Sequence, residues 1–254
     1  MCEVVLLQKI YGESSLDELK EVLKGLCEGL RVELTGLSVV ENGWVKVEIS
    51  GEDEKVAVRF LERELGLAPI TIRSVKRFSV LRGKVVFSGW SRMKISVDVG
   101  VFSPKPIYVF VPLRCLQGQL VDGRKFALER VAELFGLADG FPLEVRVVKA
   151  GADGFEAELT ENQLELYSRW IDSRVDRLVV LGALGERVRE AVRRARLKRD
   201  VLGVESLDFL EHVVVCNLGT DARGLVPKLG RRLFKARFVR FSPFRVLEFV
   251  GGCW

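Results

Sequence analysis

The pattern of apolar positions in the first seventy-five residues predicts alternating strands and helices. Leucine and valine recur at positions 16, 19, 22, 23 and 26, which is the spacing of one helix face. Asn42-Gly43 lies between two β-rich runs and predicts a hairpin, because both residues tolerate positive φ. Gly66 and Pro69 end a second helical pattern. The predicted elements are strand 4–7, helix 16–26, strands 32–40 and 44–49, helix 53–65 and strand 70–75. This βαββαβ order predicts a ferredoxin-like fold.

The last part of the chain repeats this order. A capping box at Thr160 and Gln163 predicts the start of a linking helix that runs to Trp170. After it come strand 177–181, helix 186–198, strands 201–207 and 212–218, helix 225–234 and strand 237–241. The two copies share no sequence similarity, so the prediction is a second ferredoxin-like domain with an extra N-terminal helix, and not a duplication.

The middle segment has short apolar runs joined by polar, glycine and proline turns. Its predicted elements are strands 80–88, 93–99 and 107–111, helices 113–120 and 126–135, and strand 143–148. Three strands, helical structure and a further strand are most of the order of an OB-type barrel. We therefore predict an α+β fold in which two ferredoxin-like domains, 1–77 and 151–254, flank a β-rich, OB-like domain, 78–150.

Two predicted strands of the middle segment carry a resemblance. The run Gly83-Lys84-Val85-Val86, followed by Val97-Asp98-Val99-Gly100-Val101, resembles the OB-fold RNA-binding repeat of ribosomal and exosome proteins. The pattern of that repeat is a G-x-V strand followed by a V-D-hydrophobic-G strand. The resemblance implies an RNA-binding barrel with base-stacking aromatic residues on its second and third strands. The aromatic side chains available for that role are Phe87, Trp90, Phe102 and Tyr108.

Two longer stretches carry a second resemblance. They run from Pro112-Leu113 to Pro142-Leu143 and from Leu218-Gly219-Thr220-Asp221 to Lys228-Leu229-Gly230. With these stretches, the chain resembles along its full length a conserved archaeal protein family of unknown function. The resemblance implies an archaeal source and a chain in three parts, and it implies no activity.

Charge differs between the three parts. Lysine and arginine against aspartate and glutamate number 8 against 14 in residues 1–70, 14 against 6 in 71–149 and 18 against 15 in 150–254. The excess of acidic residues in 1–70 and of basic residues in 71–149 predicts separate units with different partners. The composition, 48% hydrophobic and 30% charged, excludes global disorder.

Residue counts exclude several kinds of catalytic and metal site. His212 is the single histidine, so a histidine-rich metal site and a two-histidine zinc motif are both excluded. It begins an apolar strand, where we interpret it as a hydrogen-bonded structural residue. The five cysteines have no CxxC spacing.

No apolar run reaches the length of a membrane span, and the first residues lack the pattern of a secretory leader. We expect a cytoplasmic protein without metal or cofactor, and a binding role rather than catalysis.

Positive charge gathers on the predicted helices of the last segment. Val188, Ala191, Val192 and Ala195 have the spacing of a buried helix face, which leaves the neighbouring arginines on the outer face. Both helices of a ferredoxin-like fold cover the same side of the sheet, so their cations are expected to form one phosphate-binding surface. The predicted nucleic-acid contacts are Arg189, Arg193, Arg196, Arg223, Lys228, Arg231, Arg232 and Lys235 in the last segment, and Lys84, Trp90, Arg92, Lys94 and Phe102 in the middle segment.

The loop at residues 217–224 contains Arg223 and two glycines. Its spacing matches neither a Walker loop nor a dinucleotide fingerprint, so a cofactor is not indicated. Thr220 or Asp221 is expected to serve as an ordinary helix N-cap.

Charge distribution and barrel pattern together predict a non-enzymatic RNA-binding or ribonucleoprotein-associated factor. Its OB-like and C-terminal domains would hold phosphate backbone, and its acidic N-terminal domain would face a protein partner. Three alternatives remain open at this point. The charges could be an ordinary solvated helix face; the ferredoxin-like domains could serve oligomerisation or small-molecule binding in a regulatory or assembly protein; or the chain could be an RNA-acting enzyme whose carboxylates one sequence does not reveal.

Overall fold

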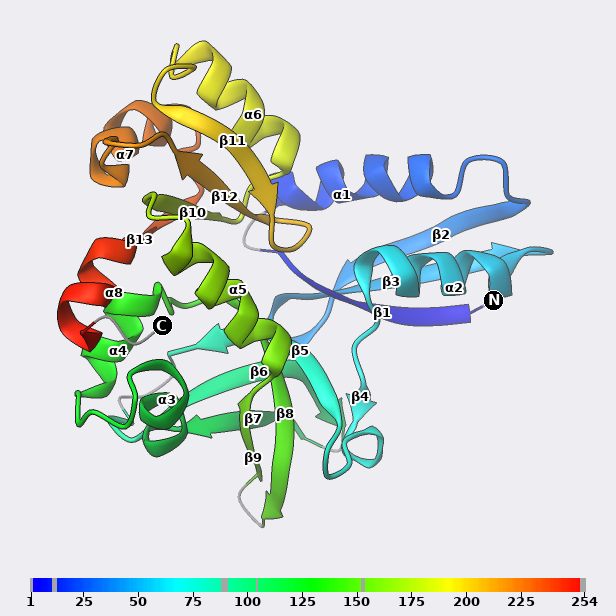
Figure 1. Cartoon of the computed structure of the whole chain (residues 1–254). Coiled ribbons are helices and arrows are strands. Elements are labelled where there is room, and N and C mark those ends of the chain that lie inside the picture. Colours follow the sequence, from blue (N-terminus) through cyan, green and yellow to red (C-terminus); the bar gives the residue numbers. More distant parts are fainter. Residues whose placement is uncertain (1, 11–12, 88–90, 104, 152–153, 252–254) are drawn as a thin grey trace. The chain divides into compact units, whose positions relative to one another are not determined.

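The computed structural model describes residues 2–10, 13–87, 91–103, 105–151 and 154–251, which form a mixed α+β structure (Figure 1). The chain divides into two compact units: an N-terminal unit of Met1–Ser74 and Val99–Ile107, and a C-terminal unit of Val75–Asp98 and Tyr108–Trp254. The barrel-like segment and the last α/β segment, assigned to separate domains in the sequence analysis, lie together in the C-terminal unit.

The N-terminal unit contains an antiparallel three-stranded sheet in the order β1-β3-β2. Its elements are β1 (Cys2–Lys9), α1 (Glu13–Leu26), β2 (Val32–Val39), the 3-10 turn η1 (Glu41–Gly43), β3 (Trp44–Gly51), α2 (Glu54–Leu65), β4 (Ile70–Thr71) and the 3-10 turn η2 (Ile72–Ser74). The predicted hairpin is confirmed, since Asn42 and Gly43 have φ of 61° and 85° between β2 and β3. The predicted end of α2 is confirmed as well, with Gly66 at φ 74° as its C-cap.

The predicted fourth strand of this unit is wrong in extent and in partner. Only Ile70–Thr71 is a strand, and it pairs in parallel with β6 (Lys94–Ser103) instead of joining the three-stranded sheet. Beside β1, the chain makes a short antiparallel contact in which the Leu7 N–H donates to the Gly66 carbonyl at 2.9 Å. Pro69 has no N–H with which to extend that ladder. The sheet of this unit therefore has one strand fewer than the predicted order.

The C-terminal unit begins with a five-stranded sheet that closes on itself. Its elements are β5 (Val80–Val86), the first half of β6, β7 (Ile107–Pro112), α3 (Leu113–Leu120), α4 (Leu128–Phe135), β8 (Pro142–Gly151) and β9 (Gly154–Leu159). The strands follow the order β6-β5-β8-β9-β7, and β7 pairs again with β6. The β7–β9 pair is parallel, whereas β5–β6, β5–β8 and β8–β9 are antiparallel. The β-rich, barrel-like middle of the chain is confirmed.

Strand β9 closes this barrel and was not among the predicted strands. Phe155, Ala157 and Leu159 are buried, while the residues between them are half-buried. This alternation is that of a strand with one face on a core. The residue after β9 is Thr160, whose hydroxyl accepts a hydrogen bond from the Gln163 N–H and so confirms the predicted capping box.

The second sheet of the C-terminal unit has four antiparallel strands in the order β11-β12-β10-β13. Its surrounding elements are α5 (Glu161–Asp172), β10 (Arg177–Leu181), α6 (Gly185–Arg194), β11 (Val201–Ser206), β12 (Glu211–Cys216), α7 (Ala222–Gly230), β13 (Arg237–Phe241) and α8 (Pro243–Val250). The βαββαβ element order predicted from β10 to β13 is confirmed, whereas α8 was not predicted.

Helices α6 and α7 cover one face of this sheet (Figure 1). Leu178 of the sheet, Val188 of α6 and Leu225 of α7 belong to one buried cluster. The opposite face packs on α5, where the rings of Trp170 and Phe241 lie 5.1 Å apart. Because both faces of the sheet are covered, its strand ends and its edge strands β11 and β13 remain for contact with ligands.

Candidate nucleic-acid interface

A groove of about 880 Å³ opens on the C-terminal unit, and we call it the barrel groove. This volume is in the range of about 300–1,000 Å³ that is typical of ligand pockets. Its lining comes from the barrel segment (Val86, Phe87, Ser91, Arg92, Lys94, Ser96, Tyr108), from α4 and the residues after it (Leu128, Glu129, Ala132, Glu133, Leu137, Ala138) and from the last segment (Arg223, Phe238, Val239, Arg240, Arg245).

The barrel wall of the groove combines a cation with aromatic rings. Strand alternation buries Ile95 in the barrel and directs Lys94 and Ser96 of β6 to the outer side. The Lys94 ammonium lies 4.3 Å from the centroid of the Phe110 ring on β7, within cation–π distance. Tyr108, two residues earlier on β7, also lines the groove. Strands β6 and β7 therefore present charge and π-faces on one surface.

The opposite wall carries three arginines in different states. Arg240 of β13 donates from Nε to the buried Asp176 carboxylate at 3.2 Å, and Arg245 of α8 pairs with Glu133 at 2.6 Å. Arg223, in the first turn of α7, is exposed and has no carboxylate within 4 Å among the residues that the structure describes. Arg223 is thus the cation of this wall that is available to an anionic ligand.

The structure brings three of the predicted contacts, Arg92, Lys94 and Arg223, into one groove. They come from β6 with its preceding loop and from α7, which are distant in the sequence. Arg240 and Arg245 were not among the contacts predicted from the sequence. Their carboxylate partners lie 64 and 112 positions away, so no local signal could have found them.

The other predicted contacts of the last segment lie on α6 and α7 or shortly after them, and we call this set the helix surface: Arg189, Arg193, Arg196, Lys228, Arg231, Arg232 and Lys235. The buried face of α6 is as predicted, with Val188 and Ala191 in the core. The Arg232 guanidinium donates to the Lys228 carbonyl at 3.2 Å and to the Arg194 carbonyl at 3.3 Å, so the C-terminal ends of both helices meet at this side chain.

Acidic neighbours neutralise part of the helix surface. The ion pairs are Arg189–Glu186 at 2.7 Å, Arg193–Glu190 at 3.9 Å and Lys228–Asp200 at 3.8 Å. Exposed pairs of this kind contribute little and are readily exchanged for other anions. Arg196 and Arg231 are exposed and have no such pair in the described part of the chain.

One predicted contact is wrong, one lies apart from the others and one is not placed. Lys84 is only 1% exposed and is engaged by two carboxylates, so it cannot reach a phosphate. Phe102 is half-buried and packs against the Trp44 cluster of the N-terminal unit, outside the barrel groove. Trp90 lies outside the described residues.

Two family models match the sequence: the DUF2110 N-terminal domain over residues 3–69 and the DUF2110 C-terminal domain over residues 175–239, together just over half of the chain. The chain belongs to the DUF2110 family. This agrees with the predicted resemblance to a conserved family, and its archaeal source stays a prediction. A comparison with curated proteins finds no match.

Among solved structures, the DUF2110 chain matches the crystal structure of a protein from Thermus thermophilus with 16% identity and a TM-score of 0.17. The match covers 98% of this chain and 42% of that protein. A TM-score this low carries no structural argument.

None of the described helices of the DUF2110 protein is long and apolar enough to cross a membrane. The described residues also contain no group of three or more histidine, cysteine and acidic side chains that could hold a metal ion.

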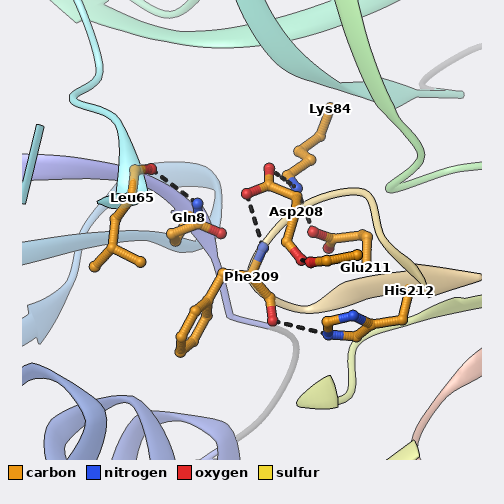
Figure 2. A network of polar contacts seen from close by, with 8 residues as sticks. Gln8, Leu65, Lys84, Asp208, Phe209, Glu211 and His212 are labelled. Carbon is orange, nitrogen blue, oxygen red and sulfur yellow. Dashed lines mark hydrogen bonds and ion pairs between the residues drawn. The ribbon is translucent and has the colours of Figure 1, made fainter. Parts of the chain in front are cut away.

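A buried network in the C-terminal unit explains the position of Lys84 (Figure 2). Its ammonium on β5 donates to Glu211 Oε2 at 2.5 Å and to Asp208 Oδ2 at 2.7 Å, both from the β11–β12 hairpin. One cation is thus shared by two carboxylates. Burial raises the pKa of Glu211 to about 7, with the Lys84 charge opposing and the Asp208 charge adding to the shift. Next to it, His212 Nε2 lies 3.1 Å from the Phe209 carbonyl, which confirms the structural interpretation of this histidine.

Figure 2 also shows a bond internal to the N-terminal unit, in which the Gln8 side-chain amide donates to the Leu65 carbonyl at 2.9 Å. This bond attaches the C-terminal end of α2 to β1. Gln8 is buried, so the amide satisfies a backbone carbonyl that water could not reach.

The raised pKa of Glu211 predicts a pH dependence of stability. The folded pKa, about 7, lies above the ordinary value of 4.5, so between these values the native state holds a proton that the unfolded state releases. The free energy of unfolding should therefore fall as pH rises through this window, by up to about 1.4 kcal/mol per pH unit. Burial lowers the pKa of His212, which acts in the opposite direction.

Urea unfolding of the wild type and of Glu211→Gln, compared between about pH 5 and pH 8, isolates the Glu211 contribution because His212 is common to both. We expect the variant to lack the decline. Identical slopes in the two proteins would show that Glu211 does not titrate in this window.

Proposed function

We propose that this DUF2110 protein binds unpaired RNA through the barrel groove, as a non-enzymatic RNA-binding or ribonucleoprotein-associated factor. The observation that carries the proposal is the convergence of Arg92, Lys94 and Arg223 in a groove that also contains Phe87 and Tyr108. Phosphates bind cations, and unpaired bases stack on aromatic side chains. The helix surface would add contacts to the RNA backbone.

The strand order of the barrel supports this proposal. If β5 to β9 are numbered as strands 1 to 5, their order around the barrel is 1-2-3-5-4, and strand 4 pairs with strand 1. Strands 3 and 5 form a parallel pair. From this order we infer an OB-type barrel. Such barrels bind oligonucleotides on strands 2 and 3 and on the loop between strands 1 and 2. Arg92, Lys94 and Tyr108 occupy that loop, strand 2 and strand 3. The order β11-β12-β10-β13 likewise supports a ferredoxin-like arrangement of the second sheet.

Filter binding of a single-stranded RNA over a salt series tests the proposal. Each phosphate contact to a single strand contributes about 0.7 to the slope of log affinity against log salt. With three groove cations engaged, we expect a slope of about −2 or steeper. Absent binding, or binding that does not respond to salt, would contradict the proposal.

A small anionic metabolite is the second candidate ligand, because the volume of the groove also suits a single small molecule. A thermal-shift panel separates the two. A metabolite that stabilises the protein while RNA neither binds nor competes would favour a regulatory role. The acidic N-terminal unit as a surface for a protein partner, and the cytoplasmic location, stay predictions.

A further inference from the structure

Phe234, after the end of α7, has an exposure that the fold does not explain. It is 79% exposed, the largest fraction among the large apolar side chains of the described residues. Its neighbour Leu233 is buried in the cluster beneath α6 and α7, so the core of the sheet is filled without Phe234. An aromatic ring exposed to water is stabilised when a ligand covers it.

The backbone that carries this ring is anchored. The Ala236 N–H donates to the Leu233 carbonyl at 2.9 Å and closes a tight turn with Phe234 and Lys235 at its tip. Both ends of the turn are anchored, since Leu233 is buried and Ala236 packs on the same cluster. A ring on an anchored turn loses little conformational entropy when it binds a flat partner.

One cation lies near the ring and two more precede it closely in the sequence. Lys235 Nζ lies 5.8 Å from its centroid, and Arg231 and Arg232 are exposed one turn before it. Arg232 is held by the carbonyls at the ends of both helices, as described above. No acidic residue occurs between positions 222 and 245. A ligand that fits this site has a flat apolar face and nearby negative charge, which describes an unpaired nucleotide.

We propose that Phe234 is a stacking platform for an unpaired nucleobase, with Arg231, Arg232 and Lys235 contacting the adjacent phosphates. This inference rests on the proposed function and deepens it, because it distinguishes unpaired RNA from duplex RNA at the helix surface. In a duplex the faces of the bases are stacked on each other and are not offered to the ring.

The test compares Phe234→Ala with Phe244→Ala, a matched control that removes another exposed phenylalanine, 60% exposed, from the first turn of α8. The probes are a short single-stranded RNA that contains 2-aminopurine and a blunt duplex of the same sequence. We expect Phe234→Ala to weaken single-strand binding about 5- to 100-fold, to reduce protein-induced quenching of 2-aminopurine, and to leave duplex affinity and the salt slope unchanged. Phe234→Trp should retain binding, and Phe244→Ala should match the wild type.

Three outcomes overturn the inference and are distinguishable. If Phe234→Ala binds the single strand as tightly as the wild type, with the steep salt dependence retained, the stacking platform is wrong and the proposed function stands. If the wild type binds no RNA, both fail. An equal loss for single strand and duplex would also overturn the inference, because it would indicate a general effect on the turn instead of stacking.

Discussion

Replacing Lys84 by alanine is expected to lower the free energy of unfolding by about 3–5 kcal/mol, the usual cost of removing one partner of a buried ion pair. The Lys84 ammonium is the shared cation between Glu211 and Asp208, at 2.5 and 2.7 Å. Without it, Glu211, which is fully buried, loses the charge that compensates its desolvation. Urea titration should show a lower midpoint at an unchanged slope.

Arg82→Ala is the matched control, because Arg82 lies two residues earlier on β5 but its side chain is 75% exposed, in an ion pair with Glu144 at 3.2 Å. Its removal should cost at most about 1 kcal/mol. Combining Lys84→Met with Glu211→Leu removes both fully buried charges and should recover most of the lost stability. An equal loss for Lys84→Ala and Arg82→Ala would refute the importance of the buried network.

Features determined by neighbouring residues could be predicted from the sequence. The Asn42-Gly43 hairpin, the Gly66 C-cap and the capping box at Thr160 all depend on side chains within a few positions, and the structure confirms them. Strand β9 pairs locally with β8, where Gly154 lies opposite Gly151, but it also depends on a more distant partner, β7. Its alternation of apolar and polar residues spans only five positions, which is a weak strand signal beside the strong helix signal that follows it.

Partners that are distant in the sequence also determine which residues form the candidate site. Lys84 and Lys94 are both lysines on barrel strands, yet one is buried and the other lines the groove. The difference lies in the partners of Lys84, which are 124 and 127 positions away in the chain. Composition therefore indicates that the middle segment is basic. Which of its basic residues are buried and which are open to a ligand is known only from the tertiary structure.

Replacing Arg92, Lys94 and Arg223 together by alanine is expected to weaken single-stranded RNA binding about a hundredfold at about 0.1 M salt, because three phosphate contacts account for a slope of about −2. The slope of log affinity against log salt should become shallower by about 2, because three phosphate contacts are lost. Damage to the fold would not produce this change in slope. None of the three side chains is buried, so the melting temperature should stay close to that of the wild type. Filter binding over a salt series measures affinity and slope together.

The matched control replaces Lys20, Lys55 and Arg59, three exposed cations of the N-terminal unit, by alanine. Both triple variants lose three positive charges, so a binding loss caused only by net charge would be equal in the two. We expect the control to bind within about twofold of the wild type, since long-range attraction is screened at this salt concentration. Equal losses would show that RNA is held by the general charge of the molecule and would remove the barrel groove as its site. Loss confined to the groove variant, together with a shallower slope, would assign the phosphate contacts to Arg92, Lys94 and Arg223.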